Sequence, residues 1–210
     1  MRDYVEWHKD YDDPASDLSW RLRMVQGYIA RALAETSGPV RVVSLCSGDG
    51  RDILGVLSQR PGDLARVAVT LVEINPALAG RARSAAQALE ITHCEVRELD
   101  AGVTSSLAGA VPADIVLLVG IFGNISNEDL ERTVKYAPQL CNPGATVVWS
   151  RARQDGDVND QVRQWFAEAG FAEVAYEAPD FGSKPAVGVC VYEGPAVTLS
   201  EGGRLFTFVR

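Results

Sequence analysis

Apolar residues in this chain fall into two patterns, short continuous runs and stripes with helical spacing. Runs at 40–46, 66–74 and 114–119 have the length of strands and end at glycine, proline or polar residues. They predict buried strands, and the run at 114–119 predicts a strand that is buried on both faces. After Ser16, which is suited to cap a helix, an amphipathic helix is predicted. Its apolar stripe consists of Leu18, Leu22, Val25, Ile29 and Leu33.

Predicted strands and helices alternate along most of the chain. The predicted strands are 40–46, 66–74, 94–99, 114–119 and 145–150. Helices are predicted after the first, second, fourth and fifth of these strands, at 52–59, 76–89, 127–141 and 159–169. Asn142-Pro143-Gly144 is interpreted as a break before the strand at 145–150. Three further strands, at 171–177, 186–193 and 205–210, have no helices between them. This order predicts an α/β fold with a doubly wound, mostly parallel sheet and an antiparallel edge hairpin.

Residues 1–37 precede the alternating pattern and are predicted to form an N-terminal helical lid, while 38–210 form the main part of a single globular domain. If 3–10 is helical, one face of that helix carries the side chains of Tyr4, Trp7, His8 and Tyr11. These side chains either fix the helix to the core or face a ligand, and the sequence leaves both interpretations open.

Composition narrows the class of partner. The 210 residues carry a formal net charge of −8, which disfavours nucleic acid or an anionic membrane as the main partner. No apolar run reaches the ~18 residues of a membrane span, and no secretory signal is evident, so a cytoplasmic location is predicted. The four cysteines are scattered without metal-ligand spacing and are expected to be reduced, and no metal site is predicted. Arginine far outnumbers lysine, which fits a bacterial source.

Candidate chemistry lies where the predicted strands end. In a doubly wound sheet, ligands bind at the carboxyl ends of the strands, where the strand order reverses. The glycine turn Ser47-Gly48-Asp49-Gly50 follows the first strand, Glu73 ends the second, Asp100 ends the third and 120–124 follows the fourth. An acid roughly 20 residues beyond a glycine turn is the usual ribose ligand. The set therefore predicts a nucleoside-containing ligand, although a charged residue at a strand end is often only solvated.

The glycine turn also indicates which nucleoside cofactor fits. A dinucleotide fingerprint placed on Gly48 and Gly50 would put Ile53 where a small residue is needed, and Asp49 and Asp52 would repel a pyrophosphate. No P-loop sequence is present. A cofactor without phosphates is favoured, and an NAD(P)-dependent oxidoreductase remains a less favoured alternative.

Residues 38–210 resemble class I S-adenosylmethionine-dependent methyltransferases. The first motif of that family, an acid followed by Gly-x-Gly-x-Gly, aligns on Ser44, Cys46, Gly48 and Gly50. The resemblance implies a seven-stranded Rossmann-like sheet, and S-adenosyl-L-methionine as the cofactor with S-adenosyl-L-homocysteine as its product. Ser44 and Cys46 depart from the motif. We expect Cys46 to keep a negative φ. The negative charge near the methionine ammonium group is expected from Asp49 or Asp52, of which Asp52 is favoured.

The resemblance also implies a role for each strand end. Glu73 binds the ribose hydroxyls, Ile74 flanks the adenine, and Asp100 and Ala101 contact its amine and ring. The implied cofactor-binding residues are Cys46, Ser47, Gly48, Gly50, Asp52, Glu73, Ile74, Asn75, Asp100, Ala101, Gly120, Ile121 and Phe122, of which the last three line the methionine side.

The segment after the fourth strand indicates the kind of acceptor. Family members that methylate amines of nucleic acid bases usually carry an acid or amide, two prolines and an aromatic residue here, whereas this chain has Gly-Ile-Phe-Gly-Asn. A small-molecule acceptor is therefore predicted, and we expect it to be moderately hydrophobic, as in secondary metabolites (natural products). The protein itself is predicted to be a monomer or a homodimer. Candidate substrate-binding residues are Tyr4, Trp7, Asn124, Arg151 and Arg153. A non-catalytic protein that binds S-adenosylmethionine or its product is the main alternative.

Methyl transfer from a sulfonium is an in-line displacement, in which positioning of the reactants supplies most of the catalysis. A base is needed only if the acceptor carries a proton when it attacks. His8 is the first candidate because it titrates near neutral pH, and Tyr11 is the second. His93 is predicted to be structural and Trp149 to lie in the core.

Overall fold

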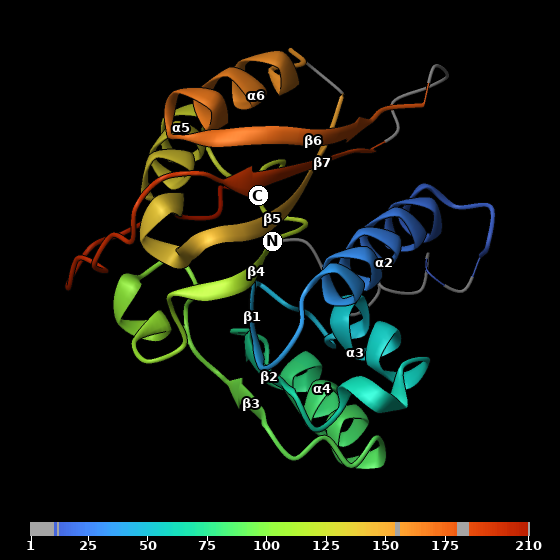
Figure 1. Ribbon diagram of the computed structural model, residues 1–210. Helices are drawn as coiled ribbons and strands as arrows, with labels where there is room; N and C mark the ends of the chain where they lie inside the picture. Colours follow the sequence, from blue (N-terminus) through green and yellow to red (C-terminus); the bar gives the residue numbers. More distant parts are fainter. Residues whose placement is uncertain (1–10, 12, 154–155, 180–184, 210) are drawn as a thin grey trace.

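The computed structural model describes residues 11, 13–153, 156–179 and 185–209. Seven strands form one sheet with the order β3-β2-β1-β4-β5-β7-β6 (Figure 1). The strands are β1 (Val40–Leu45), β2 (Val67–Val72), β3 (Cys94–Arg97), β4 (Ala113–Leu118), β5 (Cys141–Ala152), β6 (Phe171–Glu177) and β7 (Pro185–Tyr192). Strands β1 to β5 are mutually parallel, and β7 runs antiparallel to both β5 and β6. The predicted doubly wound, mostly parallel sheet with an antiparallel edge hairpin is confirmed.

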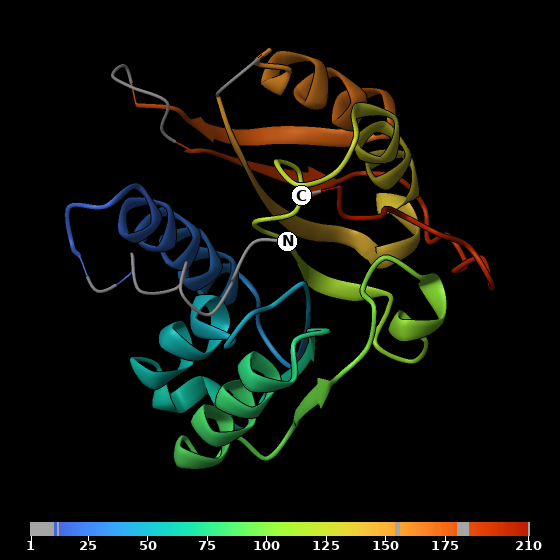
Figure 2. The same cartoon turned by 180° about the vertical axis from the view of Figure 1, so that it is seen from behind.

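Helices cover both faces of this sheet. The helices are α2 (Asp17–Glu35), α3 (Arg51–Ser58), α4 (Pro76–Ala88), α5 (Asn127–Tyr136) and α6 (Asn159–Glu168), with short 3-10 helices η2 (Pro61–Asp63), η3 (Thr104–Leu107) and η4 (Ala137–Leu140). Figures 1 and 2 show α2, α3 and α4 on one face and α5 and α6 on the other. Each face has its own buried apolar cluster, so the sheet separates two cores.

The predicted helix caps form as expected. The Ser16 hydroxyl accepts a hydrogen bond from the Ser19 amide at 3.0 Å, and the Ser126 hydroxyl accepts one from the Asp129 amide at 3.1 Å. Each bond satisfies one of the amide groups that have no partner within the first turn of a helix. Helix α2 buries Val25 and residues beyond it on the predicted stripe, but its first turns bury Ser19 and Arg21 rather than Leu18 and Leu22. No helix in the described part of the chain is long and apolar enough to cross a bilayer.

Alternation along the central strand supplies both cores. In β4, Ile115 and Leu117 join the cluster beneath α2, α3 and α4, whereas Val116 and Leu118 join the cluster beneath α5 and α6. Successive side chains of a strand point to opposite faces, so a continuous apolar run fills both layers. The prediction that this strand is buried on both faces is confirmed.

The predicted break at Asn142-Pro143-Gly144 is wrong. Strand β5 begins at Cys141 and includes these residues as a bulge, because the pairing with β4 shifts from Ala113 opposite Cys141 to Ile115 opposite Thr146. The Asn142 amide nitrogen donates to the Asp114 carboxylate at 2.7 Å and holds the extra residues beside β4. A β-bulge tolerates proline and glycine in a strand, and periodicity alone does not reveal it.

The predicted strand at 205–210 is also wrong for its described residues. Residues 203–209, called the C-terminal strap below, make only isolated bridges, from Arg204 to Val103 and from Phe208 to Ile125. Both edges of the sheet lie elsewhere, at β3 and β6, and the strap instead crosses the loops that follow β3 and β4. Close approach is possible because residue 102 is glycine: a Cβ there would lie 2.3 Å from the Phe206 carbonyl oxygen.

Candidate functional site

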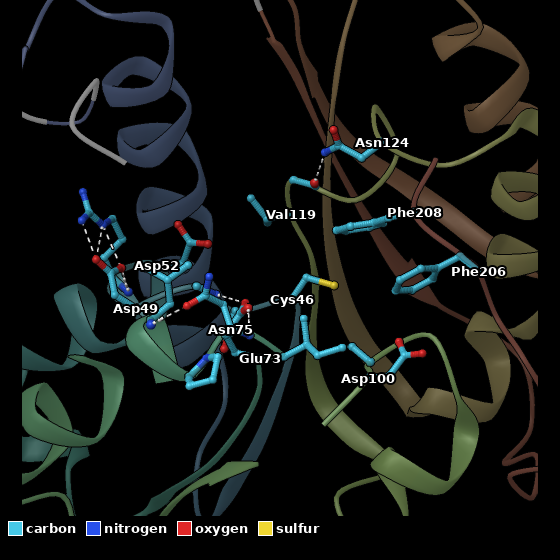
Figure 3. A pocket seen from close by; sticks show the side chains of 18 of the residues that line it. Cys46, Asp49, Asp52, Glu73, Asn75, Asp100, Val119, Asn124, Phe206 and Phe208 are labelled. Atoms are coloured by element: carbon cyan, nitrogen blue, oxygen red, sulfur yellow. Dashed lines mark hydrogen bonds and ion pairs between the residues drawn. The ribbon is translucent and has the colours of Figure 1, made fainter. Parts of the chain in front are cut away.

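A cavity of about 580 Å³ opens at the carboxyl ends of β1, β2 and β4, within the range of small-molecule sites, roughly 300–1,000 Å³. Figure 3 shows residues from these strand ends and from the C-terminal strap facing one another across it. The predicted site residues that line this cavity are Tyr11, Cys46, Ser47, Gly48, Asp52, Glu73, Ile74, Asn75, Asp100, Ala101, Gly120 and Asn124. Most of the predicted cofactor-binding residues therefore line one cavity.

Glu73 is the most firmly held acid of the cavity. The residue is 7% exposed, and its carboxylate accepts two backbone hydrogen bonds, from Gly48 N to Oε2 and from Asn75 N to Oε1, each 2.8 Å long. The first bond joins the end of β2 to the turn after β1, and the second lies within the turn into α4. A carboxylate oxygen accepts more than one hydrogen bond. Both oxygens therefore keep the capacity to accept a bond from a pair of ligand hydroxyls.

The glycine turn corrects the expectation for Cys46. Its φ is +51°, in the left-handed region, as are those of Gly48 and Gly50. A side chain in that region costs roughly 1–2 kcal/mol, so the turn between β1 and α3 holds Cys46 in a conformation that suits glycine. Burial, and then the charges of Glu73 and Asp100, raise the pKa of its thiol. The thiol is therefore neutral, and Figure 3 shows it directed toward the C-terminal strap.

Gly50 does not line the cavity, contrary to prediction. A Cβ at this position would lie 2.8 Å from the side chains of Leu54 and Leu71. This glycine therefore allows the turn to pack against the core, and its contribution to the cavity is indirect.

The two acids of the turn lie in different surroundings. The Arg51 Nε donates to Asp49 Oδ1 at 2.9 Å, and the Arg51 guanidinium lies 4.1 Å from the centre of the Tyr11 ring. Asp52 stands at the start of α3 and lines the cavity. The charge of Asp49 is thus balanced within the turn, whereas Asp52 presents an acid to the cavity.

Arg21 lines the cavity from α2 and is not among the residues that the sequence predicts for the site. It is 7% exposed, and its Nη2 donates to the hydroxyl of Tyr11. A Cβ added at Gly120 would lie 3.7 Å from its Nη1, so the guanidinium is close to the end of β4. The available signal was its position four residues before Val25, which places a charged residue on the buried side of an amphipathic helix.

Tyr11 lines the cavity, but its surroundings do not suit a base. Burial raises the pKa of its phenol, against the lowering effect of the nearby Arg21 charge. The hydroxyl is therefore protonated at neutral pH. Tyr11 is better suited to donate a hydrogen bond or to line the cavity than to remove a proton.

The residues predicted to contact adenine, Ile74, Asp100 and Ala101, all line the cavity. Ile74 lines the cavity and is 64% exposed, so a ligand bound there would cover apolar surface. Asp100 accepts a hydrogen bond from Gly102 N at 2.8 Å, and its other oxygen pairs with Arg204 at 3.1 Å. Arg204 belongs to the C-terminal strap, so the strap also contacts the turn that follows β3.

The strap contributes four residues that the sequence analysis did not assign to the site. Arg204, Phe206, Thr207 and Phe208 line the cavity. The rings of Phe206 and Phe208 are stacked, with centroids 5.7 Å apart and planes 21° apart. Nothing in the local sequence pattern distinguishes these residues from an alternating edge strand, so the sequence predicts a strand here.

Several predicted site residues lie elsewhere. The side chains of Ile121 and Phe122 are in the core beneath α5 and α6, where Phe122 contacts Trp149 with ring centroids 5.9 Å apart; they do not line the methionine side. Arg151 and Arg153 do not line the cavity but donate to the carbonyls of Ala152 and Pro179. The predicted core position of Trp149 is confirmed.

The predicted residues Tyr4, Trp7 and His8 lie outside the described residues, and so does the predicted helix that carries them. His93 lies just before β3, at the amino ends of the strands and therefore away from the cavity, where its carbonyl accepts a hydrogen bond from Val69 N at 2.8 Å. Within the described ranges, no group of three or more histidine, cysteine or acidic residues is arranged to hold a metal ion.

Strand order and cavity position together define the fold of class I S-adenosylmethionine-dependent methyltransferases, as the sequence resemblance predicted. No family model matches the chain, and no curated protein matches its sequence. Among solved structures, the chain is similar to magnesium protoporphyrin IX methyltransferase from Synechocystis, crystallised with bound S-adenosylmethionine. That match has 15% sequence identity, a TM-score of 0.70 and 90% coverage of each chain.

A second similar structure is 1,6-didemethyltoxoflavin-N1-methyltransferase from Burkholderia thailandensis, with bound 1,6-didemethyltoxoflavin and S-adenosylhomocysteine (17% identity, TM-score 0.67, covering 91% of this chain and 84% of that chain). The 4+2 cyclase SpnF is also similar (17% identity, TM-score 0.54, covering 71% of this chain and 59% of that chain). Because one of the similar structures is named as a cyclase, the fold by itself does not determine the reaction.

Proposed function

We propose that this chain binds S-adenosylmethionine and transfers its methyl group to a small-molecule acceptor. The observation that carries the proposal is the Glu73 carboxylate, held by Gly48 N and Asn75 N at the edge of the cavity. A carboxylate fixed in this way is suited to accept hydrogen bonds from the two hydroxyls of a ribose. The similar structures crystallised with S-adenosylmethionine or S-adenosylhomocysteine support the choice of nucleoside.

The remaining residues fit the parts of this cofactor. Ile74 and Asp100 line the cavity beside Glu73, and we assign them to the adenine ring and its amine. The Ser47 hydroxyl is buried and, among the described residues, has no hydrogen-bond partner, so it is suited to a polar ligand atom. Asp52 and Arg21 line the same cavity with opposite charges. They match the ammonium and carboxylate groups of the methionine end.

When bound, the sulfonium supplies a methyl group that is already electrophilic, and no acid is needed for its departure. The residues of this chain then have to align the acceptor and exclude water, an effect worth up to ~7–11 kcal/mol in favourable cases. Asn124 is suited to hold the acceptor: its Nδ2 donates to Gly120 O at 2.8 Å, which fixes the amide and leaves its oxygen to accept a bond. For an acceptor that must lose a proton, we propose His8 as the base.

We propose a moderately hydrophobic acceptor, as in many secondary metabolites. The cavity supports this choice because Ala101, Val119, Phe206 and Phe208 make part of its wall apolar.

Calorimetry with S-adenosylhomocysteine tests the cofactor assignment. Glu73→Gln puts an NH2 group where an oxygen accepts a backbone N–H, so we expect the affinity to fall at least tenfold. Glu168→Gln on the exposed side of α6 is the matched control and should leave it unchanged. Binding of NAD without binding of S-adenosylhomocysteine, or an unchanged affinity in Glu73→Gln, would contradict the proposal.

Turnover separates an enzyme from a non-catalytic binding protein. The wild-type chain is incubated with S-adenosylmethionine and a panel of phenols, amines and thiols, and S-adenosylhomocysteine release is measured by mass spectrometry. Release that requires an acceptor supports methyl transfer. Tight cofactor binding with no release across the panel would favour the binding protein.

A further inference from the structure

The Asp100 carboxylate is held by two donors that belong to different segments of the chain. Its Oδ1 accepts a hydrogen bond from Gly102 N at 2.8 Å, within the turn that follows β3. Its Oδ2 pairs with Arg204 Nη1 of the C-terminal strap at 3.1 Å. Asp100 and Arg204 both line the cavity. Each carboxylate oxygen has two lone pairs, so this arrangement fixes the carboxylate and still leaves it able to accept a bond from a ligand.

Backbone contacts fasten the strap to the turn after β3 without the help of this ion pair. Thr104 N donates to Gly203 O at 2.9 Å, and Gly203 N donates to Thr104 Oγ1 at 2.9 Å. On the other side of Arg204, Leu205 N donates to Gly102 O at 2.7 Å. The backbone of Arg204 is therefore placed by its two neighbours, and removal of its side chain should leave the strap where it is.

The Arg204 guanidinium is itself held in place. Its Nη1 also donates to Phe206 O at 3.2 Å and to Thr207 Oγ1 at 3.4 Å, so the side chain lies along the strap. The side chains of Arg204 and Asp100 are 48% and 42% exposed. An ion pair with this exposure contributes little to the stability of a fold. The main consequence of the contact is therefore local, because it restrains a half-exposed carboxylate that a single hydrogen bond would hold less firmly.

We propose that Arg204 is a positioning residue that holds the Asp100 carboxylate for the 6-amino group of the cofactor's adenine. The inference rests on the proposed function, in which Asp100 is assigned to that amine. An ionised carboxylate only accepts hydrogen bonds and an amino group donates them, so the two are complementary. A carboxylate whose orientation is already fixed loses less conformational freedom when the amine binds.

The expected size of the effect follows from the exposure of the pair. Exposed ion pairs are weak in water, so loss of Arg204 should lower the affinity for S-adenosylhomocysteine by about threefold. Most of the affinity remains with the residues of the strand ends, such as Glu73, which backbone amides hold without the strap. Arg204 therefore adjusts how the base is recognised, and the strand ends supply the binding.

The test compares S-adenosylhomocysteine with its analogue in which hydrogen replaces the 6-amino group, each titrated calorimetrically into the full chain. The wild type should bind S-adenosylhomocysteine at least about fivefold more tightly, because the analogue leaves the carboxylate without its amine. In Arg204→Met the affinity for S-adenosylhomocysteine should fall about threefold, while the affinity for the analogue changes by less than about 1.5-fold. Arg204→Lys retains a donor and should keep most of the preference.

Arg83→Met is the matched control, because it breaks an ion pair of the same exposure at another place. Arg83 pairs with Glu98 at 3.4 Å, with side chains 47% and 42% exposed, and neither residue lines the cavity. Both affinities should stay at their wild-type values in this variant.

An equal loss for both ligands in Arg204→Met would show that the side chain acts through the strap, and would overturn the proposal. A gain in affinity for S-adenosylhomocysteine would mean that Arg204 competes with the amine for Asp100, and would also overturn it, as would a wild type without preference for the amine. Failure of the wild-type chain to bind S-adenosylhomocysteine would instead refute the proposed function on which the inference rests.

Discussion

The two sides of the cavity are built in different ways. The strand-end side, residues 46–52, 73–75 and 100–101, carries the acids and is held by hydrogen bonds between neighbouring turns, such as Gly48 N to Glu73. The strap side includes Arg204 and Thr207, but its surface near the end of β4 is largely apolar and consists of Val119, Phe206 and Phe208 with the amide of Asn124. The first side is suited to orient a polar nucleoside, and the second is suited to select a ligand mainly by its shape and apolar surface.

The two sides also depend on different contacts. Each strand-end residue stands within a few positions of a strand, so forming the sheet places it. The strap reaches the cavity only because Leu205 packs in the core and bonds to Gly102, about a hundred residues earlier in the chain. A substitution that displaces the strap should therefore weaken acceptor binding and leave cofactor binding nearly unchanged.

The largest effect is expected for Leu205→Ala. Leu205 is fully buried beneath α5, and truncation of such a leucine costs about 2–5 kcal/mol in the free energy of unfolding. Urea denaturation measures this loss. Val209→Ala, on the same strap but 63% exposed, should change the free energy by less than about 0.5 kcal/mol.

Calorimetry on Leu205→Ala at low temperature then tests whether the two sides are independent. The affinity for S-adenosylhomocysteine should stay within about threefold of the wild type, because the strand-end side does not include Leu205. A threefold change corresponds to about 0.7 kcal/mol, since each 1.4 kcal/mol is a factor of ten. If a folded Leu205→Ala chain loses that affinity, the strap supports both sides and the distinction fails.

The difference between the sides also explains what the sequence could predict. Glu73 and Asp100 were predictable because each ends an apolar run and because ligands of doubly wound sheets bind at such ends. Phe206 and Phe208 were not, since alternating residues at the end of a chain have the same pattern in an edge strand and in a strap. Only the tertiary fit at Gly102 separates the two outcomes.

Backbone conformation and burial account for the other departures. The left-handed φ of Cys46 follows from the turn and not from the residue type, so the amino acid was a poor guide. Ile121 and Phe122 follow the end of β4, as the resemblance required, but their apolar side chains are buried with Trp149 in the core. For such residues, proximity in sequence to a strand end does not determine where the side chain points.

Arg21 belongs to neither the strand-end side nor the strap side, because it reaches the cavity from α2. If its guanidinium binds the carboxylate of the methionine end, Arg21→Gln should lower the affinity for S-adenosylhomocysteine about tenfold, as expected for a charge-assisted hydrogen bond. 5′-Methylthioadenosine lacks that carboxylate and should bind with less than a twofold change. Calorimetry with both ligands makes the comparison within one variant, and an equal loss for both would show that Arg21 acts through the fold.

The smallest effect concerns Cys46, which lies where the two sides meet. Cys46→Ala and Cys46→Gly both remove the thiol, but only glycine adopts a φ of +51° without strain. We expect the glycine variant to be more stable than the alanine variant by about 1 kcal/mol in urea denaturation. An alanine variant of equal or higher stability would mean that residue 46 does not hold the left-handed conformation. The turn would then present Gly48 N to Glu73 differently, and the strand-end side would lose the bond that joins its first two strands.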